Sequence, residues 1–151
     1  MDKEKAKSEI GFLVEKYNKI VEENRVKKYN EEMTKKDFIL PLFRALGWKV
    51  EDSREVTAEE KISKGRVDYG FRIDGISKFF LEAKSLKVDL DKEKHFEQAI
   101  SYAWHKGCTW AVLTDFEAVK ILNAEWKAAN YLQSHFTTIR YDEFLDRFDV
   151  L

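Results

Sequence analysis

What the sequence lacks narrows the class of protein. Cys108 is the one cysteine among 151 residues, which excludes an intramolecular disulfide and a cysteine-based zinc site. Its neighbours are apolar, so we expect an ordinary core residue. No apolar run approaches a membrane span, and the charged start does not resemble a signal peptide. These absences predict a cytoplasmic protein without a membrane partner. The histidines also lack metal-ligand spacing; they are His95, His105 and His135.

Linker-like sequence and excess charge are also scarce. The chain has one proline, six glycines, no internal repeat and no low-complexity segment, which predicts a single domain over residues 1–151. We expect a helical part at about 4–46, an α/β core at about 47–140, and a helix at 141–151 that would serve as a linker. Lys+Arg 27 against Asp+Glu 28 leaves a net charge of −1. DNA binding would therefore have to rest on local clusters of basic residues.

Apolar residues at helical spacing predict two N-terminal helices. The first runs from about Glu4 to Asn24, and the second follows a cap at Asn30 and ends at Gly47. Pro41 lies inside the second pattern and removes one backbone donor. We therefore expect a kink or shifted boundaries around this proline.

The remainder alternates between strand and helix patterns, which predicts an α/β sandwich. The almost wholly apolar segment 109–114 indicates a strand covered on both faces, and the strand after it should complete a hairpin. The expected strands are Trp48–Glu51, Arg66–Ile73, Lys78–Lys84, Thr109–Thr114, Ala118–Asn123 and Phe136–Arg140, and the expected helices are Leu90–Lys106 and Asp142–Phe148.

Three charged side chains in the strand pair at 66–84 suggest a metal site. Asp68 interrupts the apolar residues of the first strand, while Glu82 and Lys84 lie two residues apart and so on one face of the second. Two carboxylates and an ammonium in a small volume suit a hard divalent cation and a water that attacks a phosphodiester. The alternative is an amphipathic hairpin whose polar face simply meets water.

Strand parity makes the metal-site hypothesis testable. A loop with an odd number of residues sets Asp68 directly opposite Glu82, whereas an even loop turns Asp68 to the other face. The hypothesis therefore predicts a loop of three or five residues around Gly75.

The expected helix over Leu90–Lys106 carries a second polar feature. Gln98 and Tyr102 are spaced i, i+4 and share a face with His95. An amide and a phenol are neutral donors that could position phosphate oxygens without reading sequence. The alternative is an ordinary helix surface with Tyr102 partly in the core. A separate, more apolar stripe consists of Phe96, Ala99, Ile100 and Ala103.

Taken in order, these segments resemble the PD-(D/E)XK nuclease superfamily. More narrowly, they are similar to the N-terminal nuclease region of type I restriction R subunits (HSDR N-terminal-like) and of type IIG restriction–modification enzymes. Val67 stands where the superfamily name expects proline, and motifs of a helicase, a methyltransferase or a target-recognition region are missing. The resemblance runs from about Asn30 to Asn123 and rests on Asn30–Thr34, Phe38–Leu42, Leu46–Trp48, Gly65–Tyr69, Leu81–Lys84, Gln98 with Tyr102, and Leu113–Asp115.

The resemblance implies a fold and a set of roles. It implies a restriction-endonuclease-like three-layer α/β/α core with a central mixed β-sheet, preceded by N-terminal helices. Asp68 and Glu82, with the backbone carbonyl of Ala83, would hold one or two Mg²⁺ ions, for which Mn²⁺ can substitute. Lys84 would orient or help deprotonate the attacking water, and Glu31 would supply a further carboxylate. Spacing does not separate Glu31 from Glu32 in this role, and Thr34 has a structural role.

The function implied is that of a Mg²⁺-dependent DNA endonuclease domain of a restriction–modification system. Its partners would be double-stranded DNA and linked or associated methyltransferase, helicase or target-recognition domains. Two alternatives stay open. One is a non-catalytic nucleic-acid-binding or assembly module that keeps the nuclease fold, and the other is a RecB-like exonuclease.

Overall fold

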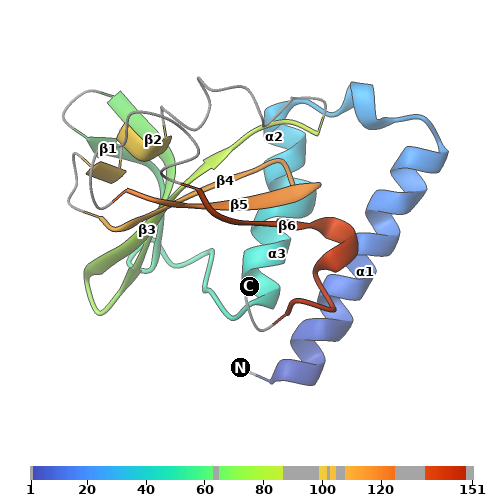
Figure 1. Ribbon diagram of the computed structural model, residues 1–151, viewed down its shortest axis with the longest axis horizontal. Coiled ribbons are helices and arrows are strands. Elements are labelled where there is room, and N and C mark those ends of the chain that lie inside the picture. Colours follow the sequence, from blue (N-terminus) through green and yellow to red (C-terminus); the bar gives the residue numbers. More distant parts are fainter. Residues whose placement is uncertain are drawn as a thin grey trace.

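A six-stranded mixed β-sheet organises the molecule (Figure 1). The computed structural model describes residues 2–62, 65–86, 99–101, 103–104, 108–124 and 135–148. The strands follow one another across the sheet in chain order, and every neighbouring pair is antiparallel except β3 and β4, which are parallel. They are β1 (Val56–Ile62), β2 (Gly65–Ile73), β3 (Ile76–Ala83), β4 (Trp110–Thr114), β5 (Ala118–Asn123) and β6 (His135–Arg140).

The parallel β3–β4 pair requires a crossover, which the chain makes between Ala83 and Trp110. Residues 99–101 and 103–104 of this crossover are helical, and most of the helix expected over Leu90–Lys106 lies outside the described residues. Five of the six expected strands are confirmed as β2 to β6, with boundaries within about two residues. The β4–β5 hairpin is also confirmed.

The helix α1 (Lys3–Glu22) confirms the first predicted helix. Asp2 caps it by accepting hydrogen bonds from the backbone N–H groups of Glu4 and Lys5 at 3.0 and 3.3 Å. Its buried residues recur every three to seven positions and so form one face against the sheet; they are Ala6, Ile10, Tyr17 and Ile20.

The second predicted helix is built from three consecutive pieces: α2 (Glu31–Thr34), a π-helical segment (Lys35–Ile39) and α3 (Leu40–Ala45). Asn30 is its cap and accepts from the N–H of Met33 at 2.8 Å. Pro41 cannot donate to the carbonyl of Asp37 four residues earlier, and the Lys16 ammonium donates to that carbonyl instead at 3.0 Å. The expected irregularity is therefore present as a π-helical turn before the proline.

Gly47 ends α3 with φ of 104°. Its N–H donates to the Arg44 carbonyl at 3.0 Å, and the N–H of Trp48 donates to the Phe43 carbonyl at 3.1 Å, which is a Schellman termination. The strand expected over Trp48–Glu51 is wrong, because this segment forms no strand and ends in a turn at residues 50–51. The Trp48 side chain packs on aromatic rings of the sheet rather than pairing its backbone there.

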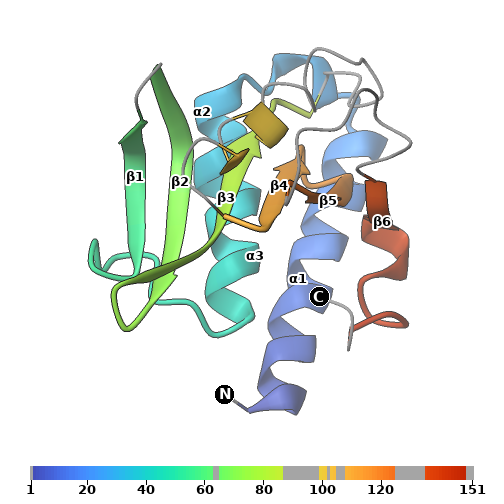
Figure 2. The same cartoon turned by 60° about the vertical axis from the view of Figure 1, so that its left-hand side comes forward.

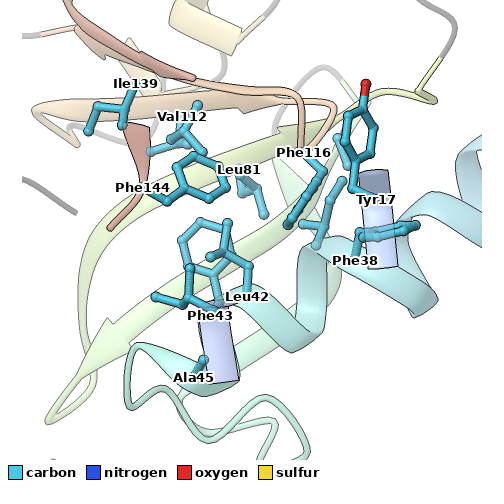
Figure 3. Close-up of a cluster of buried hydrophobic side chains, with 14 of the residues drawn as sticks. Tyr17, Phe38, Leu42, Phe43, Ala45, Leu81, Val112, Phe116, Ile139 and Phe144 are labelled. Atoms are coloured by element: carbon cyan, nitrogen blue, oxygen red, sulfur yellow. The ribbon is translucent and has the colours of Figure 1, made fainter. Parts of the chain in front are cut away.

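Two hydrophobic clusters lie on opposite faces of the sheet and make the fold a three-layer α/β/α arrangement. The larger cluster packs α1, α2 and α3 on one face; Figure 2 shows these helices side by side behind the strands. Figure 3 shows Leu42 and Phe43 of the helical segment near Leu81 of β3, and Phe38 beside Tyr17 of α1 and Phe116. On the other face, apolar residues of the crossover pack against the strands: Ala99, Ile100, Ala103 and Cys108 meet Val67, Phe80, Ala111, Leu113 and Leu122.

Both faces of β4 are therefore covered, as its apolar sequence predicts, and Cys108 is a buried free cysteine, as expected. The helix expected over Asp142–Phe148 is wrong: a 3₁₀ turn (Tyr141–Glu143) is followed by further turns. Phe144 and Phe148 of this segment are buried in the larger cluster. Within the described part of the chain, no helix is long and apolar enough to cross a membrane.

Candidate functional site

The β2–β3 hairpin brings Asp68 and Glu82 together through a two-residue turn followed by a β-bulge, a combination that the sequence does not reveal. Asp74 and Gly75 form a two-residue turn with φ of 53° and 79°, as in type I′ turns. The predicted loop of three or five residues is therefore wrong. Beside the turn Arg72 pairs with Ser77, whereas the next pair is Phe71 with Phe79. One residue of β3 is thus skipped.

The skipped residue is Lys78, and it makes a β-bulge that restores the parity required by the hypothesis. Beyond the bulge Tyr69 pairs with Leu81, so the same register would place Asp68 opposite Glu82. A one-residue bulge here has the same effect on facing as a loop of odd length.

At the end of this ladder each carboxylate binds the backbone of the opposite strand. The N–H of Asp68 donates to Glu82 Oε1 at 3.2 Å, and the N–H of Ala83 donates to Asp68 Oδ2 at 2.8 Å. Lys84 extends from the same strand end, with Nζ 3.9 Å from Glu82 Oε2. Its own N–H donates to the Thr114 carbonyl at 2.9 Å, which fixes this residue against β4. Asp68, Glu82 and Lys84 therefore converge.

Burial and charge act together on Glu82. The residue is 6% exposed, and desolvation, followed by the charge of Asp68, raises the pKa of its carboxyl to about 7, although Lys84 opposes the shift. A carboxyl with this pKa exchanges a proton near neutral pH and gains from a nearby cation. Such shifts are common at functional sites and also occur in structural networks.

Lys35 is the residue that sequence reasoning missed. It begins the π-helical segment, is 9% exposed, and places Nζ 3.1 Å from Asp68 Oδ1. The same ammonium is 3.4 Å from carboxylate oxygens of Glu31 and Glu32. Burial opposes its charge, but the neighbouring Asp68 carboxylate raises the pKa of Lys35 well above its usual range. One sequence signal was the i, i+4 spacing of Glu31 and Lys35; nothing local pointed to Asp68.

The structure distinguishes Glu31 from Glu32 by exposure. The Glu31 side chain is 44% exposed and its charge contributes to the raised pKa of Glu82. The Glu32 side chain is 84% exposed and its charge is not among the causes given for Glu82. Glu31 is therefore the better placed of the two to act near Asp68 and Glu82.

The structural role predicted for Thr34 fits its contacts. The side chain is fully buried, donates to the Asn30 carbonyl at 2.8 Å, and accepts from the N–H of Leu86 at 3.3 Å. This last bond ties the helical segment to the chain that leaves β3, close to the site.

Gln98 and Tyr102, the predicted substrate-positioning residues, lie outside the described residues, as do Phe96 and His95. Their neighbours Ala99, Ile100 and Ala103 are described, and all three are buried against the sheet. These three residues of the apolar stripe are therefore placed as expected, whereas Phe96 and the polar face stay predictions.

The donor set fits a hard divalent cation in chemistry, since Asp68, Glu82 and Glu31 offer carboxylate oxygens of the kind that Mg²⁺ prefers. Within the described ranges, however, no three Asp, Glu, His or Cys side chains are gathered as a ready group of metal ligands. Asp68 and Glu82 each accept a hydrogen bond from a backbone N–H of the opposite strand. Glu31 is linked to Asp68 through the Lys35 ammonium, which lies close to both carboxylates. The carbonyl of Ala83, which the resemblance adds to this set, belongs to the same strand end.

A second buried acid, Asp115, lies in the turn between β4 and β5. It is 4% exposed, accepts from the N–H of Ala118 at 3.1 Å, and desolvation raises the pKa of its carboxyl to about 7. Thr114 completes the turn, donating to the Ala118 carbonyl at 2.7 Å and accepting from the N–H of Phe116 at 3.0 Å. These contacts give the Leu113–Asp115 segment a structural role.

Known proteins resemble the chain in both sequence and fold. No protein-family model matches it. Over 95% of its length it is 29% identical to the type II restriction enzyme and methyltransferase RM.Eco57I of Escherichia coli, of which it covers 16%. Its fold matches the type IIG restriction endonuclease BpuSI with a TM-score of 0.53 and 16% identity, over 64% of this chain and 13% of that one. The chain is thus related to restriction enzymes, has a restriction endonuclease fold, and spans about a sixth or less of either protein.

Proposed function

We propose that this chain is the nuclease domain of a restriction–modification enzyme of the PD-(D/E)XK type, and that it hydrolyses phosphodiester bonds of double-stranded DNA with Mg²⁺. The observation that carries the proposal is the convergence of Asp68, Glu82 and Lys84 at one strand end in a restriction endonuclease fold. The relationship to RM.Eco57I over nearly the whole chain supports it from the sequence.

In this proposal Asp68 and Glu82 hold the ion with the Ala83 carbonyl, and Glu31 supplies a carboxylate nearby. When bound, Mg²⁺ lowers the pKa of a coordinated water and polarises the scissile phosphate, and Mn²⁺ can take its place. Glu82 has to be ionised to act as a ligand, and its pKa of about 7 would make binding depend on pH. Lys84 orients the attacking water and offsets the negative charge that develops on the phosphate. Gln98 and Tyr102 would position the DNA backbone.

The proposal places this chain beside methyltransferase and target-recognition functions, in the same protein or complex. RM.Eco57I is named as both a restriction enzyme and a methyltransferase, and the chain matches 16% of it. A net charge of −1 gives this chain little general attraction for DNA. Partner domains would therefore supply much of the affinity and all of the sequence recognition.

One observation favours a second candidate, a non-catalytic module with the same fold. The Lys35 ammonium neutralises Asp68 without a metal ion, as a retained structural ion pair would. The retention of Lys84 beside Glu82 argues for catalysis, because a purely structural ion pair at Asp68 needs no lysine at this position.

The test is cleavage of a supercoiled plasmid by the intact protein that carries this chain. With Mg²⁺ or Mn²⁺ the plasmid should become nicked or linear, with EDTA it should not, and Asp68→Asn should be inactive. The matched control is Asp74→Asn on the same hairpin, which keeps a residue suited to the positive φ of the turn. Degradation of linear but not circular DNA would instead indicate the exonuclease, and no metal-dependent cleavage would favour the non-catalytic module.

A further inference from the structure

Lys35 lies where the carboxylates of the site converge. Its Nζ is 3.1 Å from Asp68 Oδ1 and 3.4 Å from an oxygen of Glu31, and the Tyr69 ring lies 5.7 Å away. Asp68 Oδ2 is already bound by the N–H of Ala83. The two oxygens of Asp68 therefore have different partners, and the ammonium pairs with Oδ1.

The backbone around Lys35 is held firmly at this place. Thr34, fully buried, binds the Asn30 carbonyl on one side and the N–H of Leu86 on the other. Directly after Thr34 the helix widens into its π-helical turn, a feature often found at functional sites. This anchoring fixes the base of the Lys35 side chain and leaves its flexible stem to carry the ammonium.

We propose that Lys35 is a resident counter-ion of the candidate metal site: its ammonium neutralises Asp68 and Glu31 while no divalent cation is bound, and it competes with that cation for Asp68. The inference rests on the proposed function in one respect, namely that Asp68 and Glu82 take a divalent cation. It adds a residue that tunes how tightly the ion is held.

Glu32 gives the displaced ammonium an alternative partner. It lies 3.4 Å from Lys35 Nζ, and its side chain is 84% exposed. When a cation takes Asp68 Oδ1, Lys35 can turn toward Glu32 and keep an ion pair at the solvent edge. Glu32 thus favours metal binding indirectly, through Lys35, without itself being a ligand.

The experiment is a calorimetric titration of Mn²⁺ into the chain without DNA, paired with thermal unfolding. Lys35→Met keeps the apolar stem and removes the charge; Lys36→Met is the matched control, since the Lys36 side chain is 80% exposed. Lys35→Met should bind Mn²⁺ about tenfold more tightly or better, as expected when a charge-assisted hydrogen bond no longer competes. Its melting temperature without metal should fall, and added Mn²⁺ should raise it more than in the unmodified chain.

A second pair of variants tests the role of Glu32. Glu32→Gln should weaken Mn²⁺ binding in the unmodified chain and have no further effect in the Lys35→Met background. A loss in both backgrounds would make Glu32 a direct ligand and overturn this part of the inference.

If Lys35→Met bound Mn²⁺ no more tightly than Lys36→Met, the claim that Lys35 competes with the cation would be wrong. The proposed metal site would not be affected by this result. If the unmodified chain and every variant failed to bind Mn²⁺, the metal-dependent function would fall, and the competition with it. The two failures are therefore distinguishable.

Discussion

Glu82 and Asp115 are two buried carboxyls with similar acidity and different surroundings. Burial is the first cause of the raised pKa in both, and both reach about 7. Asp115 binds the N–H of Ala118 within its own turn. Glu82 instead meets the backbone of another strand, the carboxylate of Asp68 and the ammonium of Lys84.

The comparison shows that a perturbed pKa alone does not identify a functional acid. Asp115 closes a turn between β4 and β5. Around Glu82 lie several charged groups from the helical segment and from two strands, an arrangement that a turn does not require. We therefore propose different roles for two carboxyls of similar acidity, and variants of the two residues should separate them.

The largest expected difference lies in cleavage. Glu82→Gln should reduce Mg²⁺-dependent cleavage by the intact protein by orders of magnitude, because it removes a charged ligand of the proposed ion. Asp115→Ala should leave cleavage per folded molecule unchanged and lower the free energy of unfolding by about 1–3 kcal/mol, because the N–H of Ala118 loses its acceptor. Plasmid cleavage and urea unfolding measure the two effects. Equal losses of cleavage in both variants would remove the distinction.

The dependence of stability on pH should separate the two acids when metal is added. Each carboxyl binds a proton more tightly in the folded protein than in the unfolded chain, because its pKa is raised by folding. Protonation of either carboxyl therefore stabilises the fold at low pH, and this stabilisation is lost as pH rises from about 4 to 7. At about 1.4 kcal/mol per pKa unit, the contribution is at most about 3 kcal/mol for Glu82 and about 4 kcal/mol for Asp115.

Saturating Mg²⁺ should cancel the contribution of Glu82, because the ion favours the ionised carboxylate, and leave that of Asp115 in place. Urea unfolding of the unmodified chain, Glu82→Gln and Asp115→Asn at pH 5 and 7.5, with and without Mg²⁺, measures the difference. The assignment of Glu82 would be wrong if Mg²⁺ changed the pH dependence of Glu82→Gln as much as that of the unmodified chain.

Asp68→Asn should test the ion pair between Lys35 and Asp68 at the proposed site. Mutual repulsion of Asp68 and Glu82 alone predicts a chain without metal that is unchanged or slightly more stable. The Lys35 contact at 3.1 Å reverses this expectation: losing a charge-assisted hydrogen bond should lower the free energy of unfolding by about 1–3 kcal/mol. The variant should also lose the rise in melting temperature with Mg²⁺. Unfolding curves without metal, with Asp74→Asn as control, show whether Asp68→Asn raises or lowers the free energy of unfolding.

The smallest effects are expected from Gln98→Ala and Tyr102→Phe. Each removes one neutral hydrogen bond to the substrate, worth about 0.5–1.5 kcal/mol, so cleavage should fall by up to about tenfold. Mn²⁺ binding without DNA should not change. Normal cleavage by either variant would indicate that its residue belongs to an ordinary helix surface and does not position the substrate.

The predictable parts of the molecule are those with a strong local pattern. The α1 helix, its neighbour capped by Asn30, and the strands β2 to β6 follow from periodicity and turn residues. The strand β1 was missed because its Val56–Ile62 sequence carries adjacent Glu59, Glu60 and Lys61. Such charges suit a strand at the edge of the sheet, but they hide its alternation.

The parts of the site that could not be predicted depend on contacts between distant segments. The acids were identified from spacing, but the bulge at Lys78 that sets their register has no sequence signal here. Lys35 is 33 residues from Asp68, and its placement needs the π-helical turn and the Thr34 anchor. The comparison of Glu82 with Asp115 likewise requires the fold, since both are single acids at strand ends in the sequence.

The most direct test of the central claim is Lys84→Ala in the intact protein, with Lys36→Ala as its control, because the Lys36 side chain is 80% exposed. The variant keeps Asp68 and Glu82, so Mn²⁺ binding measured by calorimetry should survive, while Mg²⁺-dependent plasmid cleavage should fall by orders of magnitude. Cleavage by Lys84→Ala at the rate of the unmodified protein, under conditions where Asp68→Asn is inactive, would make Lys84 a structural lysine and contradict the catalytic assignment.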